Sequence, residues 1–336
     1  MPTMDVFNAD AFSMNSLTRG INNEPYVPQF LGGLGIFDVE PVATETVQVE
    51  NRNNTISLIP TTPRGSEPSN RTEELRQIRN VNTVRIAQKD RITASQVQNM
   101  RAFGSESELA TVQGEWARRT ARLQRNISLT WENMRLGAVQ GIVTDQDGST
   151  IIDWYDFWGV SQPTELDFEL DDATTDVRGK CAAVTRATVR AGGGSVMPAT
   201  RIYGLAGDTF WDDLVSHAMV RDTYLYQQGA ALREQSAFGM LDYGGITFVN
   251  YRGTDDTSTV AVGATKCKFF PVGAVDMFGV AFSPGESFDV VNTLGLPLYN
   301  MAVMDRDRNS WVQSEVYSYP LFMCYKPLAL QRAKNA

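Results

Sequence analysis

Histidine is nearly absent from the sequence, in which His217 is the single histidine among 336 residues. A Ser/His/Asp or Cys/His catalytic arrangement would have to use this residue, yet no nucleophile motif stands near it. Asp213 and His217 are four positions apart in a helix expected from Asp208 to Val220, so both could face one metal ion. Two ligands do not complete a metal site. We therefore expect no catalytic residue, no metal site and no cofactor, and do not expect an enzyme.

Cysteine is scarce and long apolar runs are missing. The three cysteines are far apart and form no CxxC pair, which disfavours a disulfide framework or a zinc knuckle and predicts three small buried side chains: Cys181, Cys267 and Cys324. No apolar run approaches the roughly 18 to 20 residues that cross a bilayer, so we expect no transmembrane helix and no membrane partner. The first residues lack the basic-then-apolar order of a secretory signal, which predicts a cytosolic product.

The overall composition is that of an ordinary globular protein, with 42% apolar and 21% charged residues. A chain of 336 residues exceeds the usual size of one domain, so we expect one large or two modest domains.

Charge is unevenly distributed along the chain. The net charge is −9, which argues against a simple nucleic-acid-binding domain. Residues 64–125, however, hold twelve basic against seven acidic side chains, whereas residues 142–310 hold twelve basic against twenty-three acidic ones. The two regions could attract each other between copies of the chain, or each could simply be a solvated face. A nucleic-acid-binding protein that uses the basic segment 64–125 is the alternative function.

The N-terminal third lacks the pattern of a self-contained core. Residues 1–35 are polar and punctuated by Asn and Pro, which predicts an extended arm. Strand-like alternation over 44–50 and 55–59 flanks a turn at 51–54, and alternation returns over 81–94 after a polar stretch. We interpret the whole as a two-stranded protrusion with a polar tip. An isolated ribbon of this kind is marginal in water, so it should dock on a neighbour or be disordered.

A long helix is expected over residues 105–143. Ser105 and Glu108 have the spacing of a capping box, and no proline interrupts the segment. The apolar side recurs about every 3.67 residues, the period of a nearly straight helix with one buried stripe. A coiled coil is the alternative, but we favour a single spine helix against a sheet. The stripe comprises Leu109, Val112, Trp116, Thr120, Leu123, Ile127, Trp131, Met134, Ala138 and Ile142.

The rest of the chain alternates helical and strand-like pieces. Gly148 is interpreted as a turn and the aromatic run 154–158 as a strand. A helix with the stripe 173–188 is closed by the glycines at 192–194. Asp208 is expected to cap the helix that follows a core strand at 201–205. Further strands are expected at 246–251, 268–272 and 279–282, and the alternating segment 311–325 predicts one long final strand beside the spine helix.

This order of elements resembles the tailed-phage and herpesvirus capsid fold, and several stretches resemble the major capsid protein E family of lambda-like phages. The stretches are Leu58 to Gly65, Thr83 to Gly104, Tyr203 to Asp212, and Met301 to Leu330. The resemblance covers nearly the whole chain. No single motif carries it alone, because this family has no catalytic signature.

The resemblance implies an α+β fold with four parts. An N-terminal arm would comprise residues 1–35 and a two-stranded extended loop residues 36–100. A peripheral domain with the spine helix 105–143 would comprise 101–170 and 306–336, and an axial α/β domain 171–305. The spine-helix core would include Leu109, Val112, Trp116, Leu123, Ile127 and Met134. Basic residues of the extended loop are our candidates for inter-subunit contacts: Arg64, Arg71, Arg76, Arg79, Arg85 and Lys89.

The resemblance also implies a structural role. Copies of the chain would assemble as hexamers and pentamers into an icosahedral phage head around double-stranded DNA, which the shell would contact non-specifically. A scaffolding protein and a portal are the partners expected from the family, and a decoration protein is a further possibility. The protein would be located in the virion, and in the host cytoplasm before assembly.

Overall fold

A computed structural model describes most of the chain. The described residues are 30–52, 76–98, 108–197, 199–226, 239–251, 253 and 260–335. The helices are α2 (Phe30–Leu34), α3 (Ala94–Gln98), α4 (Glu108–Gln140), α5 (Trp154–Trp158), α6 (Val177–Gly192), α7 (Asp208–Ser216) and α8 (Ala218–Tyr226), with the short 3-10 helices η3 (Gly193–Ser195), η4 (Phe288–Val290) and η5 (Pro327–Ala329).

The strands of the described residues form three sheets and two ribbons. One sheet has the order β1 (Asp38–Pro41), β12 (Phe278–Phe282), β15 (Pro320–Cys324), and a second the order β13 (Tyr299–Met304), β14 (Trp311–Ser318), β4 (Ile86–Thr93). The largest sheet has the order β7 (Leu166–Asp167), β16 (Gln331–Lys334), β11 (Lys266–Val272), β8 (Arg201–Ala206), β10 (Ile246–Asn250), β9 (Met240–Tyr243). The ribbons pair β2 (Thr46–Arg52) with β3 (Arg76–Asn82), and β5 (Ile142–Thr144) with β6 (Thr150–Asp153).

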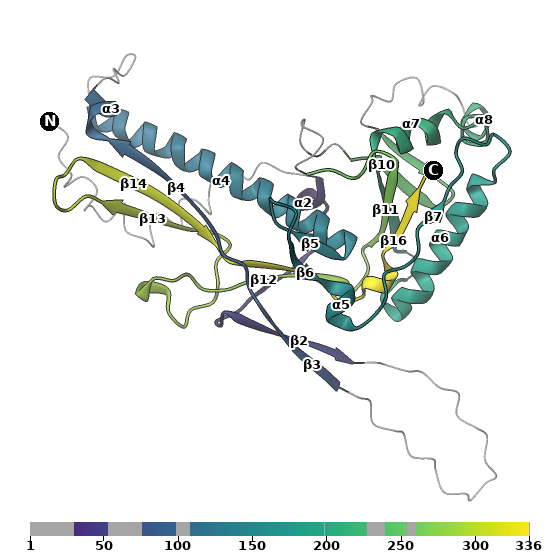
Figure 1. The fold of residues 1–336 in the computed structure, drawn as a ribbon, viewed down its shortest axis with the longest axis horizontal. Helices are drawn as coiled ribbons and strands as arrows, with labels where there is room; N and C mark the ends of the chain where they lie inside the picture. The colour runs from purple at the N-terminus through teal and green to yellow at the C-terminus, as the bar shows by residue number, and fades with distance from the viewer. Residues whose placement is uncertain are drawn as a thin grey trace, which may run out of the picture.

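The long helix α4 runs along one face of the β13–β14–β4 sheet (Figure 1). It has 33 residues and is therefore about 50 Å long at 1.5 Å per residue. The stripe expected from the sequence is buried at Trp116, Thr120, Leu123, Ile127, Trp131, Met134 and Ala138. Ser105 and the side chains of Leu109 and Val112 lie outside the described residues, and Ile142 is half-buried in β5. The buried stripe packs on β14 and also forms a hydrogen bond with it, because the indole N–H of Trp131 donates to the hydroxyl of Ser318 over 3.3 Å.

The chain reverses sharply at the C-terminal end of α4, where Gly141 has φ +84. A Cβ atom at this position would lie 2.4 Å from the ring of Tyr155, so only glycine fits. The reversal starts the β5–β6 ribbon, which leads directly into α5.

The short helix α2 is fixed to α4 by a buried carboxylate. Glu132 of α4 is 4% exposed and accepts hydrogen bonds from the backbone N–H groups of Leu31, at 2.8 Å, and Gly32, at 3.2 Å. The hydroxyl of Tyr251, at the end of β10, donates to the same carboxylate over 3.4 Å. Arg135 pairs with it over 3.4 Å and lies over the ring of Trp131. Glu132 thus joins the N-terminal segment, the long helix and the largest sheet.

The largest sheet has its own apolar core. Helices α6, α7 and α8 cover it, and Phe168, Phe210, Phe248 and Phe269 are fully buried among them. The helix α6 begins at Val177, after Asp176 accepts a hydrogen bond from the N–H of Gly179, so Ala173 of the expected stripe precedes the helix. Strands β7 and β16 belong to this sheet, so both chain segments expected for a peripheral domain, 101–170 and 306–336, also contribute strands here.

Two expected strands have a different structure. The aromatic run Trp154–Trp158 is the helix α5, because Asp153 accepts hydrogen bonds from the N–H groups of Tyr155 and Asp156 and Gly159 ends the helix with φ +67. The final segment is two strands, since β14 ends at Ser318 and β15 pairs with β12 in another sheet. The chain changes sheets at Pro320, which cannot donate a ladder hydrogen bond.

Two turn and cap expectations are also wrong. The strand β2 continues through Asn51 and Arg52, where a turn was expected, and pairs with β3; residues 55–59 lie outside the described part. Gly207, not Asp208, holds the N-cap position of α7, and Asp208 is the first helical residue.

His217 ends α7 instead of lying in the middle of one long helix. Its Nδ1 accepts the N–H of Met219 over 3.3 Å, so its Nε2–H donates to the carbonyl of Asp172, 3.1 Å away.

The packing of α4 predicts the effect of truncating its buried stripe. Leu123→Ala should lower the free energy of unfolding by about 2 to 5 kcal/mol, because the substitution removes buried methyl groups and leaves a cavity. Arg122→Ala, on the exposed side of the same turn, is the control. Thermal unfolding of the unassembled subunit measures both. An equal melting temperature for the two variants would contradict the buried face.

Candidate functional site

Among the described residues, no group of three or more His, Cys, Asp or Glu side chains is arranged to hold a metal ion. The cysteines Cys181, Cys267 and Cys324 are buried. Burial raises the pKa of the thiols of Cys181 and Cys324 to about 12, so a reactive thiolate is disfavoured at either position. No helix in the described ranges is long and apolar enough to pass through a bilayer.

The β2–β3 ribbon leaves the body of the subunit below β12, as Figure 1 shows. Its base is held by the subunit itself, because Val47 and Val49 are buried in the main core. The N–H of Thr83 donates to the carbonyl of Glu45 over 3.1 Å, and the N–H of Val84 donates to the carbonyl of Pro320 over 3.0 Å. The ribbon is therefore anchored at one end and projects at the other.

The basic residues expected at inter-subunit contacts do not share one environment. Arg64 and Arg71 lie outside the described residues, and Arg76 starts β3 with a side chain that is not described. Arg79 donates a hydrogen bond to the carbonyl of Phe157 in α5, and its guanidinium lies 5.6 Å from the centre of that ring. Arg79 therefore fastens the ribbon to its own subunit.

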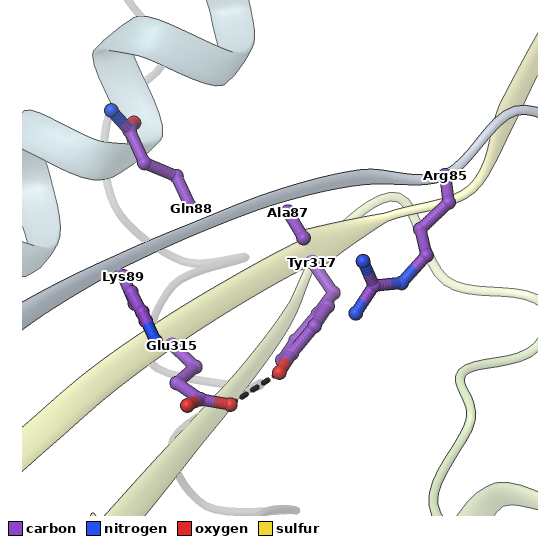
Figure 2. Close-up of a pocket in the computed structure, with 6 residues that line it drawn as sticks. All are labelled: Arg85, Ala87, Gln88, Lys89, Glu315 and Tyr317. Atoms are coloured by element: carbon purple, nitrogen blue, oxygen red, sulfur yellow. Dashed lines mark hydrogen bonds between the residues drawn. The ribbon is translucent and has the colours of Figure 1, made fainter.

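Arg85 and Lys89 line a shallow pocket on the face of the β13–β14–β4 sheet that turns away from α4. Figure 2 shows their side chains on the same side of the strands as Glu315 and Tyr317, whereas Gln88 points toward the helix. The pocket has a volume of about 270 Å³. Within it the Tyr317 hydroxyl donates a hydrogen bond to Glu315. Burial, together with this bond and the charge of Glu315, raises the pKa of Tyr317.

The same sheet face alternates cations with aromatic rings. Arg85 lies 5.2 Å from the centre of the Tyr317 ring, and Arg91 lies 4.1 Å from that of Trp311. Arg85 also forms a 2.9 Å ion pair with Glu286 in the loop after β12. Sequence reasoning missed Arg91, Trp311, Glu315 and Tyr317 as members of this face. The alternation over 311–319 was visible, but its pairing with β4 was not.

An ion-pair network connects α4 to β4. Arg119 pairs with Glu115 over 2.7 Å and with Asp90 of β4 over 3.1 Å, and it donates to the carbonyl of Arg91 over 2.7 Å. Glu115 is 8% exposed and also pairs with Arg118. Hydrogen bonds from Arg118, and next from Arg119, outweigh burial and hold the pKa of Glu115 below its ordinary value.

Comparison with known proteins gives one family over nearly the whole chain. The family described as phage major capsid protein E matches residues 13–335. The chain is 25% identical to the major capsid protein of Salmonella phage Felix O1, over 95% of each chain, and 27% identical to that of Pseudomonas phage KPP10, over 88% of this chain and 89% of the other. The crystal structure of a candidate capsid protein of a prophage in E. coli CFT073 is similar in fold. Its TM-score is 0.60 at 16% identity, covering 96% of this chain and 99% of that one.

The network around Glu115 predicts a dependence of stability on pH. Because the folded-state pKa of Glu115 is lowered, its stabilisation is fully present above the ordinary carboxyl pKa of about 4.3 and is lost as pH falls through the folded-state pKa. Glu115→Gln should therefore lower the melting temperature at neutral pH, and its difference from wild type should shrink below about pH 4.

The matched control is Asp307→Asn, which removes an exposed carboxylate in the turn between β13 and β14. Thermal unfolding of unassembled subunits between pH 7 and pH 3 measures both variants. A Glu115→Gln difference that stays constant over this range would show that the network contributes through packing alone.

Proposed function

Since this chain belongs to the phage major capsid protein E family and has the tailed-phage capsid fold, we propose that its copies assemble as hexamers and pentamers into an icosahedral head that encloses double-stranded DNA. Its role is structural, in the capsid of the virion. It performs no catalysis and needs no cofactor in this proposal. The subunits are in the host cytoplasm before assembly.

One observation carries the proposal: the β2–β3 ribbon extends beyond the contacts that Val47, Val49 and Arg79 make with its own subunit. Val47 and Val49 are buried, whereas Ile78 of β3 is 51% exposed. A two-stranded ribbon with an exposed apolar side chain gains little stability by itself in water. Contact with a neighbouring copy would cover it. The exposed ribbon therefore favours a subunit that assembles with other copies over a protein that is stable as a monomer.

The proposed parts of the subunit follow the described elements. The β2–β3 ribbon belongs to the extended loop, and α4 with the β13–β14–β4 and β1–β12–β15 sheets forms the peripheral domain. The six-stranded sheet with α6, α7 and α8 forms the axial domain, and this division moves β7 and β16 into it. In the assembled head, a scaffolding protein, a portal and a decoration protein are the proposed further partners.

The sheet face with Arg85 and Lys89 is proposed as an inter-subunit surface. It holds cations, a carboxylate and aromatic rings around a pocket, a mixture suited to contact with another protein surface (Figure 2). Arg64, Arg71 and Arg76 stay proposed contacts of the extended loop. Arg79 stays a proposed contact as well, and it also binds the carbonyl of Phe157 in its own chain.

A nucleic-acid-binding function of the segment 64–125 has less support. Three of its arginines already pair with carboxylates: Arg85 with Glu286, Arg118 with Glu115, and Arg119 with both Glu115 and Asp90. These pairs reduce the positive charge that the segment can offer to phosphates.

Shortening the ribbon tests the proposed function. Arg52 and Arg76 lie opposite each other in the ribbon, so residues 53–75 can be replaced by Asn-Gly, which favours a two-residue hairpin turn. The variant should keep the melting temperature of the unassembled wild-type subunit. In sedimentation velocity it should remain a single-subunit species under conditions in which wild type forms large particles.

Large particles formed by the shortened variant, in wild-type yield, would contradict the role proposed for the ribbon. A wild-type chain that stays monomeric at every concentration and salt would contradict the shell function itself.

A further inference from the structure

The loop between β12 and β13 presents an apolar surface to solvent. Phe288 is 97% exposed, Leu294 62%, Val291 53% and Leu296 40%, all within nine consecutive positions. Single exposed apolar residues are common on protein surfaces, but a concentration of this size marks an interaction site. We call residues 284–297 the apolar loop.

The apolar loop is held in place from inside the subunit. Val290 is buried against Tyr299 and Tyr319, and the N–H of Leu296 donates to the hydroxyl of Tyr299 over 2.7 Å. Gly295 donates its N–H to the carbonyl of Val42 over 3.0 Å. A Cβ at position 295 would lie 2.0 Å from the carbonyl oxygen of Phe282, so only glycine allows this approach. The loop thus presents its apolar side chains in a fixed arrangement, which lowers the entropic cost of binding.

The charge of the apolar loop restricts what it can contact. Its acidic residues are Glu286, which pairs with Arg85, and Asp289, which is exposed directly beside Phe288. A complementary surface therefore needs an apolar side chain flanked by basic ones. Three exposed apolar residues elsewhere stand beside carboxylates instead: Val39 with Asp38 and Glu40, Met240 with Asp242, and Val275 with Asp276.

The exposed face of α6 near its C-terminal end has the required chemistry. Arg186, Val189 and Arg190 are spaced i, i+3 and i+4, so they share one side of the helix, and all three are exposed. Lys326 donates to the carbonyl of Gly192 over 3.2 Å and to the hydroxyl of Ser195 over 2.6 Å, which holds the segment after β15 against the C-terminal end of α6. Two further exposed apolar residues, Met197 and Leu328, each follow this contact by two positions. We call this surface the α6 face.

The two surfaces lie toward opposite ends of the subunit. In Figure 1 the apolar loop, with its short helix η4, is drawn in light green below β13, and α6 is at the other end of the long axis. One chain cannot bring them together without unfolding. A contact between them must involve two copies and is heterologous, the type that builds rings when the rotation closes.

We propose that the apolar loop of one subunit docks Phe288, Val291 and Leu294 on the α6 face of a second copy, with Asp289 facing Arg186 and Arg190. This inference rests on the proposed function, because it assigns one of the contacts by which the shell assembles. It adds to the ribbon and the pocket a third contact, which is apolar at its centre and charged at its rim.

Cysteine cross-linking tests the contact directly, and the three native cysteines are buried. Subunits with Phe288→Cys and subunits with Val189→Cys are assembled together and oxidised. The mixture should give disulfide-linked dimers on a non-reducing gel, and neither variant should do so alone. Particles that form without this dimer would overturn the inference while leaving the shell function intact. Cross-linking of Phe288→Cys particles alone would also overturn it, since the loops would then meet one another.

A charge exchange decides the question if a cysteine variant fails to assemble. Asp289→Lys and Arg190→Glu should each lower the yield of particles about fivefold, and the double variant should restore it. The matched control pairs Asp289→Lys with Arg178→Glu, an exposed arginine at the other end of α6, which should not restore the yield. Equal rescue by both pairs, or by neither, would contradict the contact.

Discussion

The packing of the buried stripe of α4 determines how the other elements of the subunit are arranged. Strands β4, β14 and β15, and helix α2, all contact this helix, although they come from widely separated parts of the chain. Glu132 adds a polar fixed point within the stripe, because its carboxylate receives the N–H groups of Leu31 and Gly32 and the hydroxyl of Tyr251. The helix therefore sets the relative positions of the N-terminal segment, the β13–β14–β4 sheet and the six-stranded sheet. Strands of these sheets also hold the base of the β2–β3 ribbon, through the bond from Val84 to Pro320 of β15, and the apolar loop, through the bond from Leu296 to Tyr299 of β13.

Features of the fold that arise from local sequence patterns could be predicted from the sequence, whereas features that arise from contacts between distant residues could not. The stripe of α4 was predictable because a 3.67-residue period is a local signal, and Trp116 to Ala138 are buried as expected. The helix α5 was missed because its aromatic composition favours strands, while Asp153 and Gly159 fix both of its ends. The last strand was expected to be continuous, and the change of sheet at Pro320 depends on tertiary pairing with β12. The candidate contacts were least predictable. Arg79 meets Phe157, 78 positions away, and the exposure of Phe288 is decided by packing beneath its loop.

In the structure, several charges of the basic segment 64–125 form ion pairs within the subunit. Three of the twelve basic residues in 64–125 pair with carboxylates of the same chain: Arg85 with Glu286, Arg118 with Glu115, and Arg119 with Glu115 and Asp90. The pair between Arg119 and Asp90 joins α4 to β4, so it stabilises the subunit itself more than it contributes to contacts with other molecules. The surfaces that we propose for contacts between copies combine few charges with aromatic or apolar groups: the Arg85–Lys89 pocket, the apolar loop and the α6 face. In the proposed shell each contact recurs in every subunit, so a modest free energy per contact is sufficient for assembly.

We propose that this chain is a shell subunit whose projecting elements are covered by other copies of itself. Electron microscopy of the purified protein over a range of concentrations is the most direct measurement. The account predicts closed particles or tubes of uniform wall thickness above a threshold concentration. Monodisperse single subunits at every concentration, with DNA binding that weakens steeply as salt rises, would contradict it and favour the nucleic-acid-binding alternative.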